Sequence, residues 1–117
     1  MSAKGLRVFI VEDEAMIRMM VVDMLDELGH TIAAEAGHLD KAIELARSTD
    51  FDLAILDVNL DGKNIAPVAE VVKARGLPLV FATGYGAAGI PEEFKGYGVL
   101  QKPFQIEELQ KILGGER

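Results

Sequence analysis

Two kinds of hydrophobic pattern alternate along the chain. Short, unbroken apolar runs are typical of strands that are buried on both faces of a parallel sheet. Longer stretches carry apolar residues three and four positions apart, which is typical of helices that cover such a sheet. The unbroken runs predict strands over residues 6–11, 30–36, 51–57, 77–82 and 99–101, the second of them weak and peripheral. The spaced stretches predict helices over residues 14–28, 40–48, 64–75 and 105–113.

This order of elements predicts an α/β fold. Strands that alternate with helices through short connections form a doubly wound (βα)5 sheet with helices on both faces. The pattern breaks over residues 84–98, which contain five glycines, Pro91 and little apolar periodicity. We therefore expect the fourth helix to be shortened or replaced by a loop, with at most one turn near residues 91–94. Residues 59–64 (NLDGKN) are also predicted to be a loop, in which Asn64 caps the next helix.

Length, composition and charge narrow the range of functions. The 117 residues predict a single domain over 1–117, without an output domain. Lys and Arg number 12 against 19 for Asp and Glu, and the net charge of −7 argues against nucleic-acid binding. There is no cysteine, which excludes disulfides and thiolate metal sites. The N-terminal apolar run meets acidic residues too soon for a signal peptide or a membrane span, so a cytoplasmic protein without membrane attachment is expected.

Polar side chains stand where the predicted strands end. Glu12 and Asp13 follow the first strand and Asp57 ends the third. Thr83 follows the fourth strand and Lys102 follows the fifth. In a doubly wound sheet these ends meet at one edge, where such folds place their ligands. Three carboxylates brought together repel one another unless a cation lies between them, and hard oxygen ligands suit Mg²⁺. A carboxylate beside Mg²⁺ can attack a phosphoryl group, whose charge an ammonium and a hydroxyl then stabilise.

Each of these residues has a simpler explanation when it is taken alone. A strand-end aspartate such as Asp57 is more often a turn or capping residue. Thr83 is more often structural, and Lys102 could lie on the surface. Those explanations do not account for all five polar residues falling at strand ends in one chain. The joint pattern therefore favours a phosphoryl-accepting metal site with Asp57 as the acceptor.

The whole chain resembles a response-regulator receiver domain (CheY-like) of bacterial two-component phosphorelays. Asp57 falls on the family's phosphoacceptor, and Lys102-Pro103 falls on its Lys-Pro pair, whose peptide bond is commonly cis. The resemblance implies the strand order 2-1-3-4-5 and a histidine kinase or histidine phosphotransfer protein as the phosphoryl donor. It also implies that Mg²⁺ is held by Asp13, Asp57 and the backbone carbonyl of Asn59, that Glu12 acts through water, and that Thr83 senses the phosphoryl group.

The chain departs from the usual receiver pattern at residues that transmit the signal. Val99 occupies the place of an aromatic residue that swings inward on activation. Residues 78–85 (PLVFATGY) resemble the PFxFATGY motif of mostly stand-alone receivers, which have a shortened or mobile fourth helix and a distinct class of bacterial kinases. Our hypothesis is that signalling changes the order of this loop, with Tyr85 or Tyr97 in place of the missing aromatic. Output is then by contact with a downstream protein, or the domain acts as a phosphate sink.

The first helix is predicted to carry two apolar faces. Met20 and Met24 lie on the stripe that faces the core. Ala15, Met19 and Val22 lie on another face, which points away from the core. Because methionine adapts to varied partners, this second face predicts a partner surface. The resemblance to receiver domains, which dock this helix on the helical bundle of their kinase, implies that the partner is the kinase.

Two other classes of function remain open. A pseudo-receiver would be a binding module that works without phosphorylation. The acidic pair Glu12 and Asp13, together with Asp57 and Lys102, argues against this class. A small aspartyl phosphatase of the haloacid-dehalogenase type would carry a second aspartate two residues after the nucleophile, where Asn59 stands. Without that general acid the site is expected to hold its acyl phosphate, so no conventional enzyme is predicted. His30 and His38 are interpreted as ordinary surface or strand-end residues.

Overall fold

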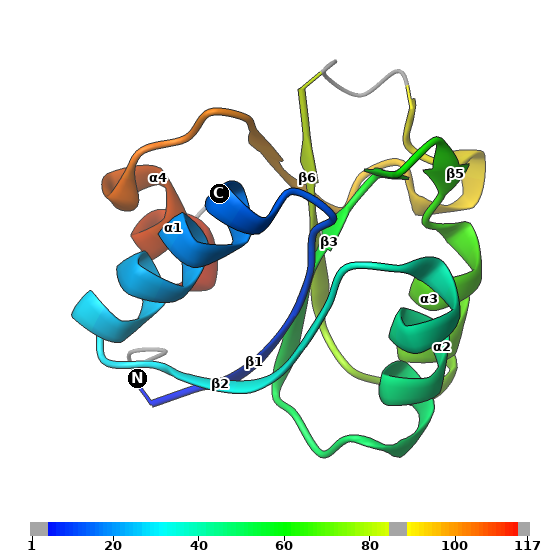
Figure 1. Ribbon diagram of the computed structural model, residues 1–117, viewed down its shortest axis with the longest axis horizontal. Coiled ribbons are helices and arrows are strands. Elements are labelled where there is room, and N and C mark those ends of the chain that lie inside the picture. The colour runs from blue at the N-terminus through cyan, green and yellow to red at the C-terminus, as the bar shows by residue number, and fades with distance from the viewer. Residues whose placement is uncertain (1–4, 85–88, 115–117) are drawn as a thin grey trace.

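The computed structural model describes residues 5–84 and 89–114 as an α/β fold (Figure 1). The strands are β1 (Arg7–Val11), β2 (Thr31–Ala36), β3 (Leu53–Asp57), β4 (Asn59–Leu60), β5 (Lys63–Asn64), β6 (Leu79–Thr83) and β7 (Gly98–Gln101). The helices are α1 (Ala15–Glu27), α2 (Leu39–Ser48), α3 (Ala66–Ala74) and α4 (Ile106–Leu113), with a 3₁₀ turn η2 (Glu92–Phe94). The main sheet is parallel with the order β2-β1-β3-β6-β7, which confirms the expected order 2-1-3-4-5.

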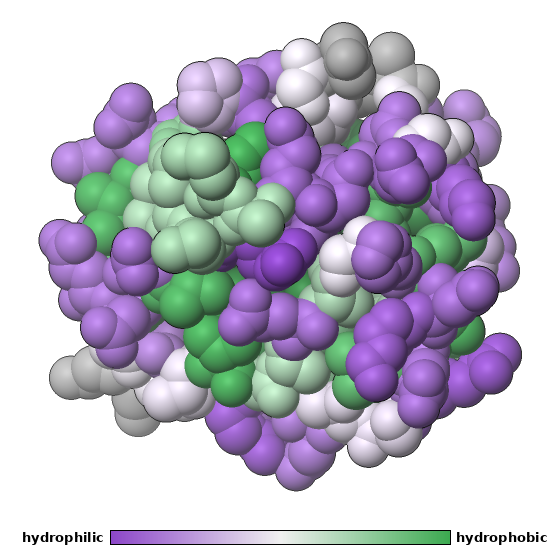
Figure 2. All heavy atoms as spheres, viewed as in Figure 1, coloured by the Kyte–Doolittle hydropathy of each residue, from purple (hydrophilic) through white to green (hydrophobic). Residues whose placement is uncertain are grey.

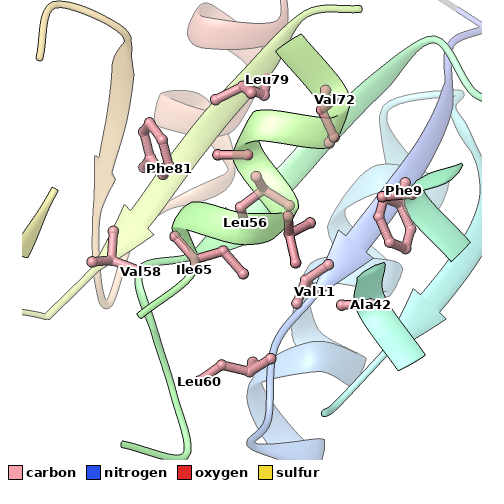
Figure 3. Close-up of a cluster of buried hydrophobic side chains, with 14 of the residues drawn as sticks. Phe9, Val11, Ala42, Leu56, Val58, Leu60, Ile65, Val72, Leu79 and Phe81 are labelled. Atoms are coloured by element: carbon pink, nitrogen blue, oxygen red, sulfur yellow. The ribbon is translucent and has the colours of Figure 1, made fainter. Parts of the chain in front are cut away.

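Helices cover both faces of the sheet, α1 and α4 on one and α2 and α3 on the other (Figure 1). Alternate residues of β1 belong to the two layers. Phe9 and Val11 pack in the cluster beneath α2 and α3, which Figure 3 shows. Val8 and Ile10 pack in the cluster beneath α1 and α4. Every residue of β3 is buried, as its unbroken apolar run predicts, and this central strand ends in Asp57.

The connection between β6 and β7 confirms the prediction of a shortened fourth helix. Its described residues contain no α-helix, and residues 92–94 form the 3₁₀ turn η2. Phe94 in this turn is buried, with its ring centroid 5.8 Å from that of Phe81 and 5.4 Å from that of Tyr97. The Nζ atom of Lys73, on α3, lies 5.5 Å from the centre of the Phe94 ring. An aromatic anchor therefore covers the sheet where the other crossover connections use a helix.

Residues 59–64 form a small hairpin, so the prediction of a plain loop is wrong. β4 pairs with β5 in antiparallel fashion, and the turn passes through Asp61 and Gly62, whose φ angles are 53° and 83°. The backbone N–H of Gly62 donates to Asn59 Oδ1 at 2.8 Å and closes the turn. Leu60 is buried and fixes the hairpin on the core. Asn, Asp and Gly mark loops in a sequence, but they are also the residues that tight hairpin turns require.

Asn64 joins this hairpin to two other segments. Its Oδ1 accepts a hydrogen bond from the backbone N–H of Ala66 at 2.9 Å, so it satisfies a donor at the start of α3, although Ile65 is the N-cap residue. Its Nδ2 donates to the carbonyl of Gly89 at 3.2 Å. A Cβ atom on Gly89 would lie only 2.9 Å from Val58 Cγ1, so this close approach requires glycine. The hairpin therefore contacts the segment that stands in place of the fourth helix.

His30 lies immediately before β2, as predicted, but it is not a surface residue. Its side chain is 7% exposed, and its Nδ1 accepts a hydrogen bond from the backbone N–H of Leu6 at 3.0 Å. Burial lowers the pKa of the imidazole, which must be neutral at Nδ1 to accept this bond. The histidine was misjudged because its partner is a backbone group, which no side-chain pattern reveals.

Acid should therefore destabilise the fold through His30. Because its folded pKa is lowered, the unfolded chain binds a proton first, and the free energy of unfolding falls as pH drops below about 6.5, the ordinary histidine pKa. His30→Asn keeps an acceptor near the Nδ1 position but does not titrate. Between about pH 7.5 and pH 5, the free energy of unfolding measured with urea should fall more in the wild type than in this variant. His38→Gln, at the exposed histidine, should follow the wild type, and parallel curves for wild type and His30→Asn would contradict this account.

No helix among the described residues is long and apolar enough to cross a membrane.

Candidate functional site

Three carboxylates meet at the carboxyl ends of β1 and β3. Glu12 and Asp13 directly follow β1, and Asp57 ends β3, its neighbour in the sheet. Oxygen atoms of the three side chains lie within 4.8 Å of one another. Glu12 and Asp57 are buried and Asp13 is half-buried. Adjacent parallel strands thus bring together acids that are far apart in the sequence, as predicted.

Lys102 brings a positive charge into this acidic cluster. It follows β7, and its backbone N–H donates to the carbonyl of Thr83, at the end of β6, at 2.8 Å. Its Nζ lies 3.2 Å from Glu12 Oε1 and 3.4 Å from Asp57 Oδ1. The peptide bond between Lys102 and Pro103 is cis. One ammonium therefore faces two buried carboxylates.

The charges in the cluster do not balance. Burial, followed by the nearby charge of Glu12, raises the pKa of Asp57 to about 7, although Lys102 acts in the opposite direction. Burial lowers the pKa of Lys102, but the carboxylates of Asp57 and Glu12 outweigh it, so the net shift of that pKa is upward and the side chain stays an ammonium. A single lysine leaves excess negative charge on the carboxylates, and a divalent cation would neutralise it.

The β4–β5 hairpin orients two of the carboxylates with backbone donors. The N–H of Asn59 donates to Asp57 Oδ1 at 3.4 Å. The N–H of Asp61 donates to Asp13 Oδ2 at 3.0 Å. Sequence reasoning missed Asp61, whose contribution is a main-chain group. Asn59 lies beside Asp57, where a metal ligand from its backbone is expected.

A pocket of about 520 Å³ adjoins the acidic cluster. Asp13, Asp57, Thr83 and Lys102 line its polar part. Its apolar wall comes from α1 and from the connection between β7 and α4, through Ile17, Met20, Val21, Met24, Pro103 and Phe104. The pocket thus gives access to Asp57 alongside an apolar surface, which suits a polar reactive group carried on an apolar protein partner.

The surface of α1 beside the pocket is rich in methionine. Met16, Met19 and Met20 are 80%, 65% and 48% exposed, and Figure 2 shows a contiguous apolar area over α1 in pale green. Ala15 and Met19 are exposed, as predicted. The predictions for two residues are wrong: Met20 is not in the core, because it borders the pocket, and Val22 packs against the core beneath α1 and α4. We call Met16, Met19 and Met20 the methionine surface.

Of the residues predicted to transmit the signal, Tyr97 packs in the other layer, beneath α2 and α3. Val99, on β7, is partly exposed. Tyr97 precedes this strand and belongs to the aromatic cluster, with its ring centroid 6.3 Å from that of Phe81. Tyr85 lies outside the described residues.

Comparison with known proteins supports this description. A family model for the response regulator receiver domain matches residues 8–114. The transcriptional regulatory protein PdtaR of Mycobacterium tuberculosis is 38% identical over 107 residues, which cover 88% of this chain and 52% of PdtaR. The chain therefore spans about half the length of this curated relative.

Solved structures give a similar picture. The solution structure of SdrG from Sphingomonas melonis Fr1 matches with a TM-score of 0.83 and 40% identity, over 97% of this chain and 96% of SdrG. A BeF3-activated conformation of SdrG from Pseudomonas melonis Fr1 matches with a TM-score of 0.78 at 40% identity, over 92% of each chain. A third match is the receiver domain of the sensor histidine kinase PA1611 from Pseudomonas aeruginosa PAO1, which was solved with magnesium coordinated in its active site cleft. The TM-score is 0.78 at 25% identity, over 93% of this chain and 94% of that one.

The family match takes in the five strands of the main sheet, apart from the first residue of β1, and the residues of the acidic cluster. Receiver domains of this kind are not conventional enzymes. This chain therefore belongs to the response-regulator receiver family, the CheY-like signalling domains of two-component systems.

Proposed function

We propose that this chain accepts a phosphoryl group on Asp57 from a histidine kinase or a histidine phosphotransfer protein, with Mg²⁺ bound beside it. One observation carries the proposal: the Nζ of Lys102 lies near both Asp57 and Glu12, whose oxygens cluster with those of Asp13. Receiver domains interact with histidine kinases. The BeF3-activated conformation of SdrG, a relative at 40% identity, supports a phosphorylatable aspartate in this group.

The donor set of the acidic cluster fits Mg²⁺. Asp13, Asp57 and the backbone carbonyl of Asn59 would hold the ion, and Glu12 would act through water. Mg²⁺ prefers oxygen ligands and keeps several waters, so a site with few protein ligands that is open to a pocket suits it. When bound, the ion would neutralise charge on the carboxylates and on the phosphoryl oxygens.

The chain's own side chains account for the rest of the transfer. An Asp57 oxygen attacks phosphorus and forms an O–P bond while the P–N bond of the phosphohistidine breaks, and the imidazole nitrogen keeps the electron pair. The Lys102 ammonium would pair with one phosphoryl oxygen, and the Thr83 hydroxyl would donate to another. Asn59 stands where an aspartyl phosphatase carries its second aspartate, so this position supplies no acid–base group to speed hydrolysis, and the acyl phosphate would persist long enough to signal.

For the output, we propose the behaviour of a stand-alone receiver without the aromatic switch. The motif PLVFATGY, the turn η2 in place of a helix, and the likeness to SdrG support it. Phosphorylation would change the order of the connection between β6 and β7, with Tyr97 or Tyr85 serving in place of the residue that Val99 replaces. The signal would pass to a downstream protein by contact, or the domain would drain phosphate from its kinase.

Amide NMR spectra with and without Mg²⁺ plus beryllofluoride, a mimic of the aspartyl phosphate, test the proposed function. We expect shifts around the acidic cluster, Thr83 and Lys102, all abolished by Asp57→Ala. Changes that extend to residues 84–98 would support the loop-ordering switch. Spectra that do not respond to Mg²⁺ and beryllofluoride would favour the pseudo-receiver, a binding module that works without phosphorylation.

We expect Met19→Glu to slow phosphoryl transfer from the cognate kinase while it spares reaction with a small phosphodonor such as acetyl phosphate. Met19 is 65% exposed on the methionine surface beside the pocket, so a charge there would oppose docking of an apolar partner without reaching Asp57. Transfer from phosphorylated kinase and from acetyl phosphate should be timed in parallel. Ala74→Glu, which adds the same charge at an exposed position of α3, is the control and should change neither rate. Equal losses with both donors would contradict a docking role.

A further inference from the structure

Arg18, on α1, contacts the main chain of the acidic pair. Its Nη1 donates to the carbonyl oxygen of Glu12 at 2.6 Å. Its Nε lies 3.2 Å from Glu35 Oε1, on β2. The Arg18 side chain is 24% exposed, so water competes only weakly for the guanidinium. Short hydrogen bonds from a charged donor are among the stronger contacts in a protein.

Both main-chain groups of Glu12 are thereby fixed. Its N–H donates to the carbonyl of Ala36 at 3.0 Å, and its carbonyl accepts from Arg18. The peptide plane that joins Glu12 to Asp13 therefore has a defined orientation between β2 and α1. Asp13 continues from that plane, so the contact with Arg18 holds the main chain that carries the Asp13 carboxylate, whose Oδ2 accepts from the N–H of Asp61.

Gly37 leaves the space that the Arg18 guanidinium occupies. A Cβ atom at this position would lie 3.1 Å from Arg18 Nη1 and 3.6 Å from the Glu12 carbonyl oxygen. Gly37 does not have a left-handed φ angle, so its backbone would accept alanine without strain. Gly37→Ala therefore disturbs the same contact without removing the arginine.

We propose that Arg18 is a positioning residue for the Mg²⁺ site. Its guanidinium locks the Glu12 peptide, and through it the Asp13 carboxylate, in the arrangement that binds the ion. This inference rests on the proposed function, because it assumes that the acidic cluster binds Mg²⁺. Arg18 acts through the main chain and is not itself expected to touch the ion or the phosphoryl group.

A purely electrostatic role for Arg18 predicts the opposite effect. Removing one positive charge from the neighbourhood of three carboxylates should strengthen the binding of another cation. Loss of positioning should weaken it. Arg18→Met separates the two, because methionine keeps much of the apolar stem but has neither the charge nor the donors of the guanidinium.

Titration with MgCl₂, followed by the amide NMR signals of residues around the acidic cluster, measures the Mg²⁺ affinity of each variant. We expect Arg18→Met to bind Mg²⁺ about tenfold more weakly, the lower end of what loss of an outer contact to a metal ligand costs. Gly37→Ala should weaken binding less, and it should add no further loss in the Arg18→Met background, because the contact is already gone. Glu35→Gln leaves the carbonyl contact in place and should keep most of the affinity.

Arg7→Met is the matched control for a loss of general stability. Arg7 stands at the opposite end of the same strand, β1, where it pairs with Asp50 and Asp52 at 2.8 Å and 2.9 Å. Its replacement should change urea denaturation but leave Mg²⁺ affinity unaltered. Unchanged or tighter Mg²⁺ binding by Arg18→Met, or additive losses in the double variant, would overturn the positioning role. Failure of the wild-type chain to bind Mg²⁺ would instead overturn the proposed function itself.

Discussion

Asp57→Asn is expected to raise the free energy of unfolding by roughly 2–4 kcal/mol at about pH 8 in the absence of Mg²⁺. Burial, together with the charge of Glu12, raises the pKa of Asp57 to about 7 in the folded chain. The unfolded chain gives up this proton near pH 4, so the folded chain holds more protons between about pH 4 and pH 7. The stability of the wild type therefore falls as pH rises through that range, whereas asparagine, which resembles the protonated acid, is not affected.

Urea denaturation of wild type and Asp57→Asn at about pH 8, 6 and 4 measures this difference, which should shrink toward zero at the lowest pH. Saturating Mg²⁺ should also close the gap by stabilising only the wild type. Asp23→Asn, at an exposed carboxylate of α1, is the control and should change stability by less than about 0.5 kcal/mol. Equal stability of wild type and Asp57→Asn at pH 8 would show that the buried carboxylate is not under electrostatic strain. Under the proposed function the same variant cannot form an acyl phosphate, so function and stability should change in opposite directions at one residue.

Phe94→Ala is expected to lower the free energy of unfolding by about 3–5 kcal/mol, the usual cost of removing a buried phenylalanine. Its ring is fully buried and is packed edge-on against both Phe81 and Tyr97, with Lys73 over its face. No α-helix is described between Gly89 and Gly98, so this ring, together with the buried side chain of Ile90, anchors the connection on the core. Removing it would leave a cavity above β6.

Urea denaturation of Phe94→Ala, Phe94→Leu and Val99→Ala compares their free energies of unfolding. It tests whether the loss comes from the Phe94 ring itself or from any substitution in this part of the fold. Leucine keeps much of the apolar volume and should cost well under half as much as alanine. Val99→Ala, at a partly exposed side chain of the adjoining strand, should cost about 1 kcal/mol or less. Similar losses for Phe94→Ala and Val99→Ala would show that the connection is not held by the Phe94 ring.

The sequence was sufficient to predict the sheet and the residues that gather at its edge. Unbroken apolar runs define buried parallel strands, and the end of each run specifies where a polar residue emerges. Asp57 and Lys102 could therefore be placed in one site before their contacts were known. The pattern does not show what packs against each face of a helix. Met20 has the spacing of a core residue, yet it is 48% exposed and borders the pocket.

Contacts made by the main chain were equally hidden. The Nδ1 of His30 and the carboxylate of Asp13 both accept from backbone N–H groups, and the carbonyl of Glu12 accepts from Arg18. Every residue has such groups, so residue types alone do not indicate which of them is used. The roles of Tyr85, Tyr97 and Val99, and the single-domain organisation over residues 1–117, stay predictions.

Contacts at two points fix the length of the β4–β5 hairpin. Its turn holds Asp13 through the N–H of Asp61, and its second strand holds Gly89 through the side chain of Asn64. Most surface connections tolerate an inserted residue at little cost. One residue added here would shift the pairing of β4 with β5 and turn either Asp61 or Asn64 away from its partner. Changes of chain length during evolution or engineering should therefore be confined to other connections.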